Sequence, residues 1–434
     1  MDPALVGVIG LLVLFVLMAV GLPIGFCFLT VGFLGTAWFR GFDPAISALA
    51  RVPLTWITQY VFTCVPLFMA MGLIIAHTGI ATDLFNVGYK WVGRVRGGLA
   101  MATTLGVGAF SAVSGSSTAC AATMAAICYP EMKRKKYSDA LATGCIAAGG
   151  GIDLMIPPSL GFVIYGIITE ESIGKLLIAG ILPGIIQVGS FLLAIYLLVR
   201  LKPEHAPMKI DEPIPWSEKF KSLKNLWSTI LLFFLVMGGI YLGWFTPNEA
   251  SAVGAAGALI LTFLQRRLNW KNLNQVLFQT SGITAVVFML VVGAMLMSVF
   301  LTMSGLPQRL AQLLGHFHSP MSVTLFILLL YIPLGMMMDA TSMIVLTLPI
   351  YQPFLAANGI NLVWFGVCVI MSVEIALIMP PMGMNVYTVK GVIKEVPMET
   401  IFRGMVPFLV ADVVVLILLY CVPWFSLFLP QLMR

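Results

Sequence analysis

Apolar stretches of about 20 residues recur along the whole chain, and this is the length that a membrane-spanning helix requires. Clear examples are Leu5–Val20, Leu176–Val199, Ile230–Trp244, Ala285–Leu301 and Val406–Val422. The first is followed at once by more apolar chain and lacks a small-residue cleavage site, so we expect a retained span and not a signal peptide. The pattern predicts an all-α polytopic membrane protein.

The composition supports this prediction. Hydrophobic residues make up 60% of the 434 positions and charged residues only 10%, whereas about 25% of residues are charged in soluble domains. The net charge of +6 is scattered among loops and does not indicate binding of nucleic acid. The seven cysteines lie inside apolar segments without paired spacing, as expected of small core residues. A Gly-x-x-x-x-Gly-Lys-Ser/Thr phosphate loop is absent, so ATP hydrolysis by that route is excluded.

Glycine and proline landmarks recur at a nearly constant offset, which indicates an internal repeat. Pro23 matches Pro247, Gly180 matches Gly404 and Pro183 matches Pro407, all 224 residues apart; Thr78-Gly79-Ile80 matches Ser304-Gly305-Leu306 at 226, and Pro157-Pro158 matches Pro380-Pro381 at 223. We therefore predict two halves at 1–205 and 225–434, joined by a cytoplasmic connecting segment at 206–224.

The basic residues indicate that the halves have opposite orientations. Arg94 and Arg96 precede the segment 97–130, and Lys133–Lys136 follow it. Because basic loops mark the cytoplasmic side, both ends of this segment are expected there, and a re-entrant helical hairpin satisfies this. Its counterpart at about 319–357 has no lysine or arginine directly after it, which suits the outer face. The threading gives about five spans and one hairpin per half with both termini outside, so the second half is inverted, as in many secondary transporters.

Each half has two places where an apolar helix is interrupted. In the first half these are Ser111–Thr118, where small hydroxyl residues surround a glycine, and Gly149–Ser159, where two prolines remove amide donors. In the second half they are Gly335–Ser342 and Pro380–Asn385. An unpaired backbone group in hydrocarbon costs several kcal/mol, so the breaks are expected to line a polar cavity or to pair with one another. Freed carbonyls suit Na⁺, and half-helix N-termini suit an anion.

Several residues at these breaks have more than one interpretation. Asp339, at the tip of the second hairpin, needs a partner, either Na⁺ or the backbone amides of its own turn. Asp153 and Glu374 are each compatible with a solvated, a helix-capping or an interdomain position. Gly149–Gly151 are also compatible with close helix packing alone. The methionine run 336–338 is more typical of flexible packing than of a metal site.

At these residues the sequence resembles the large membrane subunit of tripartite ATP-independent periplasmic (TRAP) transporters. The motifs keep their order over essentially the whole chain. They are Pro66–Gly72, Arg96–Ala100, Ser114–Ser117, Ile156–Ser159, Gly335–Asp339, Leu348–Ile350, Trp364–Val367 and Pro380–Asn385.

The resemblance implies Na⁺-coupled import of an organic acid anion (a dicarboxylate, sugar acid or sulfonate) across the bacterial inner membrane by an elevator mechanism. It also implies a small four-span membrane subunit and a soluble periplasmic substrate-binding protein as partners. In the family, hairpin tips and adjoining helix breaks form the sites. Matching positions place Na⁺, held mainly by backbone carbonyls, at Ser114, Gly115, Gly150, Pro157, Pro158, Asp339, Pro380 and Pro381, and substrate at Ser116, Ser159, Thr341, Gly383 and Asn385.

One stretch of the sequence departs from the family pattern. Gly151–Met155 contains Asp153 where members usually have an uncharged turn, which puts the usual local geometry in question.

The alternative function is a stand-alone Na⁺/dicarboxylate-type symporter that needs no binding protein. A passive channel is disfavoured by paired helix breaks. An enzyme is not expected, since the sequence has no metal-ligand histidine pair, no Ser/His/Asp arrangement and no paired intramembrane carboxylates at helical spacing.

Overall fold

The computed structural model describes residues 2–114, 117–207, 215–315, 319–335, 337–381 and 383–433, and every regular element among them is helical. The predicted all-α class is therefore confirmed. By length and composition, five helical segments in this part of the chain can cross a membrane, or up to seven if each of two sharply bent helix pairs counts as one span.

The first half contains eleven α-helices in the described residues. They are α1 (Pro3–Ala19), α2 (Ile24–Arg40), α3 (Phe42–Ile57), α4 (Cys64–Ala76), α5 (Ile80–Val92), α6 (Gly98–Ser114), α7 (Ser117–Arg134), α8 (Asp139–Gly149), α9 (Ile152–Met155), α10 (Leu160–Thr169) and α11 (Ile173–Leu201). Short 3₁₀ helices cover Tyr60–Thr63 and Pro203–His205. The 64° bend between α3 and α4 follows Pro53 by one turn.

The second half follows a similar order. Its helices are α12 (Trp216–Leu223), α13 (Trp227–Tyr241), α14 (Pro247–Leu264), α15 (Trp270–Ser304), α16 (Leu306–Gly315), α17 (Pro320–Leu334), α18 (Ala340–Ala357), α19 (Leu362–Ile378), α20 (Met384–Val392), α21 (Met398–Cys421) and α22 (Trp424–Gln431), with a 3₁₀ turn at Lys224–Leu226. Local chemistry sets several starts: Thr246 and Glu249 form a capping box on α14, and Asn361 caps α19.

Helix starts recur at the offset found in the glycine and proline landmarks. Helices α2, α7 and α11 begin 223–225 residues before α14, α18 and α21, respectively. Packing between the halves is reciprocal as well: α2 lies along α15 and α4 along α14, while α10 contacts α18 and α20 contacts α7. The element order therefore supports two related halves. Their opposite orientation in a membrane stays a prediction.

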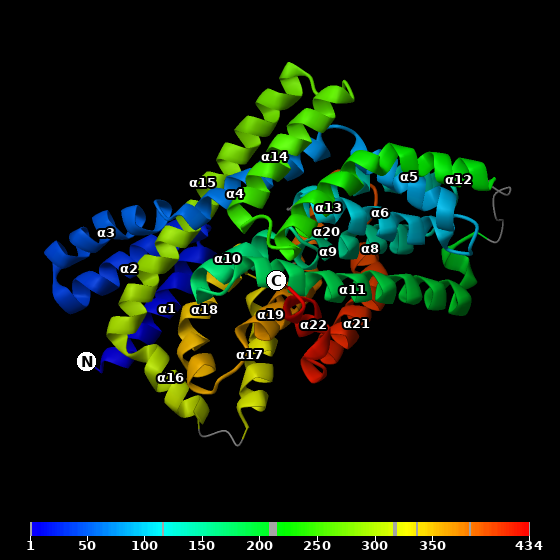
Figure 1. Cartoon of the computed structure of the whole chain (residues 1–434). Coiled ribbons are helices and arrows are strands. Elements are labelled where there is room, and N and C mark those ends of the chain that lie inside the picture. The colour runs from blue at the N-terminus through cyan, green and yellow to red at the C-terminus, as the bar shows by residue number, and fades with distance from the viewer. Residues whose placement is uncertain are drawn as a thin grey trace.

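The helices form an outer and an inner group (Figure 1). The outer group comprises α1–α4 and α13–α15, which pack mainly on one another. The inner group comprises α6–α11 and α17–α22, at the centre and lower right of Figure 1. Helices α5 and α16 connect the groups: each follows an outer helix directly and packs on an inner one, α6 and α18, respectively.

Both predicted hairpins contain two helices that follow each other closely in the chain. In the first, α6 packs on α7, and the amide of Leu99 near the start of α6 donates to the Tyr137 hydroxyl just beyond α7, at 3.2 Å. The two ends of this hairpin therefore lie side by side. Helix α7 continues through Pro130, near which the hairpin was predicted to end, to Arg134 and so includes Lys133. In the second hairpin, the hydroxyl of Tyr331 on α17 hydrogen-bonds to Thr347 of α18, at 2.6 Å.

Ion pairs join segments that the charge pattern assigns to the same side of the membrane. Arg309 donates to Asp2 at 2.5 Å, and this hydrogen bond holds the pKa of the Asp2 carboxyl below its usual value. On the other predicted side, Arg267 pairs with Asp83 at 2.5 Å. Which group of loops faces the cytoplasm stays a prediction.

The connecting segment at 206–224 is more structured than its polar composition indicated. Within its described part, α12 packs on α5, and the rings of Trp216 and Phe220 meet Trp91 edge-on at centroid distances of 6.4 and 5.9 Å. The exposed aromatic face of α12 is typical of a helix that lies at a membrane surface.

Candidate substrate and cation site

Asp339 begins α18 at the tip of the second hairpin. Its carboxylate accepts hydrogen bonds from the amides of Thr341 (3.1 Å) and Ser342 (3.3 Å), and the Ser342 hydroxyl donates to its second oxygen. The capping interpretation of Asp339 is thus confirmed. The side chain is only partly buried, so the same carboxylate also faces open space.

The second helix break lies between α19 and α20. Pro380–Pro381 is a cis peptide, and Gly383 has φ +38°, a left-handed conformation that a side chain would strain. Asn385 follows in the first turn of α20. It is fully buried, and neither its amide oxygen nor its amide nitrogen has a partner among the described residues. Buried amides are normally hydrogen-bonded, so this one is available to a ligand.

A cavity of about 620 Å³ joins the second hairpin tip to the second helix break. Its lining comprises residues of the tip, of α20 and of α2: Ile24, Gly335, Met337, Met338, Asp339, Met384, Tyr387 and Thr388. The structure therefore brings Asp339 and the start of α20 together around one space, as the sequence predicts for paired breaks.

In the first half, the helix break also lies against the hairpin. A Cβ atom on Gly150 would lie 2.8 Å from Ala121 Cβ and 3.1 Å from the Ser117 carbonyl oxygen, both on α7. Pro157–Pro158 is cis, and Ser159 is buried at the start of α10, where its hydroxyl has no partner in the described part of the chain. In the second half, Gly335 of the hairpin approaches Ala376 of α19 in a comparable way. Each hairpin tip thus contacts the break of its own half through a glycine.

The two halves meet at the same region. Helix α10, which starts at the first break, packs on α18 of the second hairpin, and α20 packs on α7 of the first. A Cβ atom on Gly161 would lie 3.6 Å from the Ser159 hydroxyl and 3.7 Å from Ile344 of α18. Four helices, α7, α10, α18 and α20, therefore have their N-terminal ends at the breaks.

The remaining predicted residues are placed as follows. Thr341 is partly buried and donates its amide to Asp339. Ser114 is the last residue of α6. Gly115 and Ser116 lie outside the described residues, so nothing is added to their predicted role.

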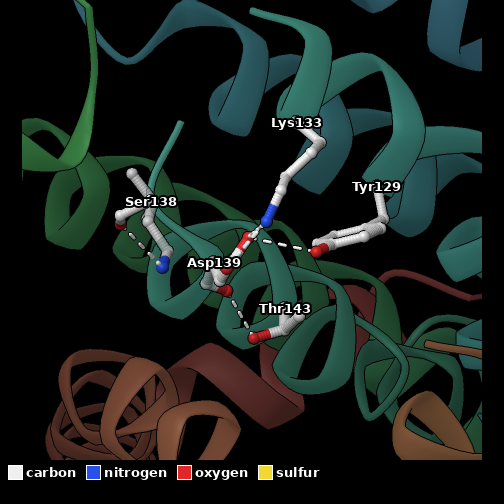
Figure 2. Close-up of polar contacts among 6 residues, drawn as sticks. Tyr129, Lys133, Ser138, Asp139 and Thr143 are labelled. Carbon is white, nitrogen blue, oxygen red and sulfur yellow. Dashed lines mark hydrogen bonds and ion pairs between the residues drawn. The ribbon is translucent and has the colours of Figure 1, made fainter. Parts of the chain in front are cut away.

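The far end of the first hairpin is fixed by a polar cluster (Figure 2). Lys133 of α7 pairs with Asp139 at the start of α8 at 2.7 Å, and the Tyr129 hydroxyl donates to the same carboxylate at 3.0 Å. Ser138 caps α8 and also meets the His205 ring at 2.7 Å. These contacts tie α7 to α8 and so position the hairpin relative to the helix that carries Gly150.

Two buried polar residues that lie together in the inner group were not predicted from the sequence. Gln187 of α11 and Asp412 of α21 are both fully buried, and they lie beside Glu374 of α19. The solvated interpretation of Asp153 and Glu374 is wrong, since their exposures are 2% and 0%. The sequence carries one signal for these two residues, which is that their positions match by the offset between the halves. Gln187 and Asp412 lie 225 residues apart, each in the last long helix of its half.

Comparison with known proteins identifies the family. The family described as "Tripartite ATP-independent periplasmic transporter, DctM component" matches residues 11–425. The chain belongs to this family. The sialic acid TRAP transporter large permease of Vibrio cholerae is 33% identical over 420 residues, which cover 96% of each protein. The C4-dicarboxylate large permease of Pseudomonas aeruginosa is 32% identical over 405 residues, which cover 93% of this chain and 94% of that protein.

The fold of this TRAP permease also occurs in a solved transporter structure. The YdaH transporter of Alcanivorax borkumensis superposes over the full length of both chains with a TM-score of 0.65, at 14% identity. The family match confirms the resemblance found in the sequence, and the two relatives are named as permeases. TRAP large permeases are multi-pass inner-membrane proteins that work with a small membrane subunit and a periplasmic substrate-binding protein.

Proposed function

We propose that this TRAP permease imports an organic acid anion together with Na⁺, and that the two hairpin tips and two helix breaks form the shared site. The observation that carries the proposal is that the helix after each break packs on the hairpin of the other half. Ser159 and Asn385 at these breaks have buried polar groups without a partner among the described residues, and Asp339 lines a cavity at the second hairpin tip. Family membership supports the transport activity, and the geometry of the breaks supports the location of the site.

Sodium fits the donor set at the breaks. No group of three or more His, Cys, Asp or Glu side chains in the described ranges is arranged to hold a metal ion. A cation would therefore rely on oxygen atoms of neutral groups, such as the carbonyls next to Pro157–Pro158 and Pro380–Pro381, as hard cations prefer. Asp339 adds one formal negative charge near the second hairpin tip.

The helix N-termini suit an anionic substrate. Asp339 already caps α18, whereas α10 and α20 begin at Ser159 and Gly383 without a side-chain cap. Open amides at a helix start attract a carboxylate or sulfonate. Relatives are named for transport of sialic acid, C4-dicarboxylates and isethionate. We propose that the substrate here belongs to the same class of small carboxylates and sulfonates.

The division into outer and inner groups supports an elevator movement. The proposed site lies wholly within the inner group apart from Ile24, while α5 and α16 connect that group to the outer helices. We propose that the inner group carries substrate across the membrane, that the outer group forms the scaffold, and that a small four-span subunit adds to this scaffold. The family's tripartite organisation favours this over a stand-alone symporter.

Uptake by reconstituted protein tests the proposal. The permease, its small subunit and its binding protein would be assayed with a panel of radiolabelled dicarboxylates, sugar acids and sulfonates. Concentrative uptake of one acid is expected only with an inward Na⁺ gradient and the binding protein present. Undiminished uptake after Na⁺ is replaced by choline would refute the coupling; undiminished uptake without the binding protein would favour the stand-alone alternative.

A further inference from the structure

Three polar side chains from three helices meet in the interior of the inner group. The Gln187 amide nitrogen of α11 lies 2.5 Å from Glu374 Oε1 of α19 and 3.0 Å from Asp412 Oδ1 of α21. All three side chains are fully buried. One amide group of the first half therefore donates to two carboxyl groups of the second half.

The remaining oxygen of each group has no partner among the described residues. Gln187 Oε1, Glu374 Oε2 and Asp412 Oδ2 are all buried and accept no hydrogen bond from any described residue. The cluster thus contains more acceptors than donors. It also lies close to the first helix break, because a Cβ atom on Gly151 would lie 2.7 Å from Glu374 Oε1.

Among the described residues, no basic side chain forms an ion pair with either carboxyl group. Lys175 and Arg200 on α11 are 12 and 13 residues from Gln187, which corresponds to roughly 18–20 Å along a helix. Arg403 on α21 pairs with Glu399, and both are largely exposed. The further ionisable group whose charge acts on Glu374 is Asp153 of α9, also a buried acid. An acid cannot neutralise the pair.

We propose that Gln187, Glu374 and Asp412 form a proton-binding site, in which the Glu374–Asp412 pair holds at least one proton. Two ionised carboxylates cannot share a buried site without a compensating positive charge. A proton on Glu374 Oε2 or Asp412 Oδ2 removes one of these charges and supplies the missing donor. This inference concerns a site other than the proposed Na⁺ and substrate site and does not depend on it.

The orientation of Gln187 favours a proton over a metal ion. Its amide nitrogen, not its oxygen, faces both carboxyl groups. A cation placed between these carboxyl groups would lie against N–H dipoles that point their positive ends at it. The proton is therefore the ligand that the arrangement fits.

Infrared spectroscopy of the purified full-length protein at neutral pH tests this site. Exposed carboxyl groups are ionised at that pH, so only a buried protonated carboxyl group absorbs in the carboxylic acid C=O region. An ester-free detergent is required, because lipid esters absorb nearby. The spectrum of the wild type is compared with that of the E374Q/D412N double variant. E399Q, an exposed acid on the same helix as Asp412, is the matched control.

We expect a carboxylic acid band in the wild type and in E399Q that is lost or strongly reduced in the double variant, with equal intensity in NaCl and choline chloride. If the double variant does not fold, E374Q and D412N alone are each expected to shift or weaken the band. A spectrum that is unchanged by these substitutions would overturn the proposal. A band that disappears when Na⁺ is added would also overturn it, in favour of a cation site.

Discussion

Replacing Gly404 with alanine places a methyl group against the backbone of α8. A Cβ atom at this position would lie 2.6 Å from the carbonyl carbon of Ala140 and 3.1 Å from its Cα, with the carbonyl oxygen closer still. Gly144, one turn along α8, faces the Gly404 backbone in the same way, with its added Cβ 2.9 Å from Gly404 Cα. Because carbon atoms prefer a separation of about 3.5–4.0 Å, α8 and α21 would have to move apart by about 1 Å.

Moving the two helices apart lowers the free energy of unfolding. Overpacking a close contact costs about 1–3 kcal/mol, and the contact here involves rigid backbone, so the upper end applies. Alanine recovers up to about 1 kcal/mol through its higher helix propensity. The expected net loss is about 2 kcal/mol of unfolding free energy. It should lower the melting temperature by a few degrees.

Thermal unfolding of the purified protein, followed by a thiol-reactive dye that reports the buried cysteines, measures this loss. Gly189→Ala on α11 is the matched control, because nothing lies within 4 Å of its added Cβ. Its melting temperature should equal or slightly exceed that of the wild type. A Gly404→Ala variant as stable as the control would refute the proposed close packing of α8 on α21.

Two further predictions concern the ends of the helices. In a cysteine-free background, single cysteines at Val95 and Lys135 should be labelled from the same face of oriented vesicles, because the ends of the first hairpin lie side by side; labelling from opposite faces would contradict the hairpin. Asp83→Asn should lower the unfolding free energy by about 1 kcal/mol, because it weakens the partly buried contact with Arg267 that joins the halves. Denaturant unfolding should show this loss for Asp83→Asn and little change for Glu399→Gln, whose exposed pair contributes little.

The fold was predictable from the sequence because each signal had a physical cause. Spans follow from apolar length, and the breaks follow from proline and glycine. The offset between halves was visible because close contacts fix glycine at equivalent places: Gly180 approaches α9 and Gly404 approaches α8. The helix end after Pro130 was missed, because a proline in the interior of α7 does not interrupt it.

The candidate site was predictable only in part. Asp339, Gly150 and Asn385 stand at recognisable breaks, and the structure shows which neighbours they meet. The meeting of Glu374 and Asp412 at Gln187 was not predictable, because the three residues lie on different helices and no spacing along one helix records it. The sequence therefore has no paired carboxylates at helical spacing, although in the fold two carboxyl groups both accept a hydrogen bond from Gln187.

The Na⁺ dependence of uptake by Asp339→Asn tests the central claim most directly. Asparagine caps a helix as well as aspartate does, so the turn and the fold should be kept while the charge is removed. If the hairpin tips and helix breaks hold the coupling ion, the variant should need several-fold more Na⁺ for half-maximal uptake than the wild type. An unchanged Na⁺ dependence in a variant of normal thermal stability would contradict the placement of Na⁺ beside Asp339.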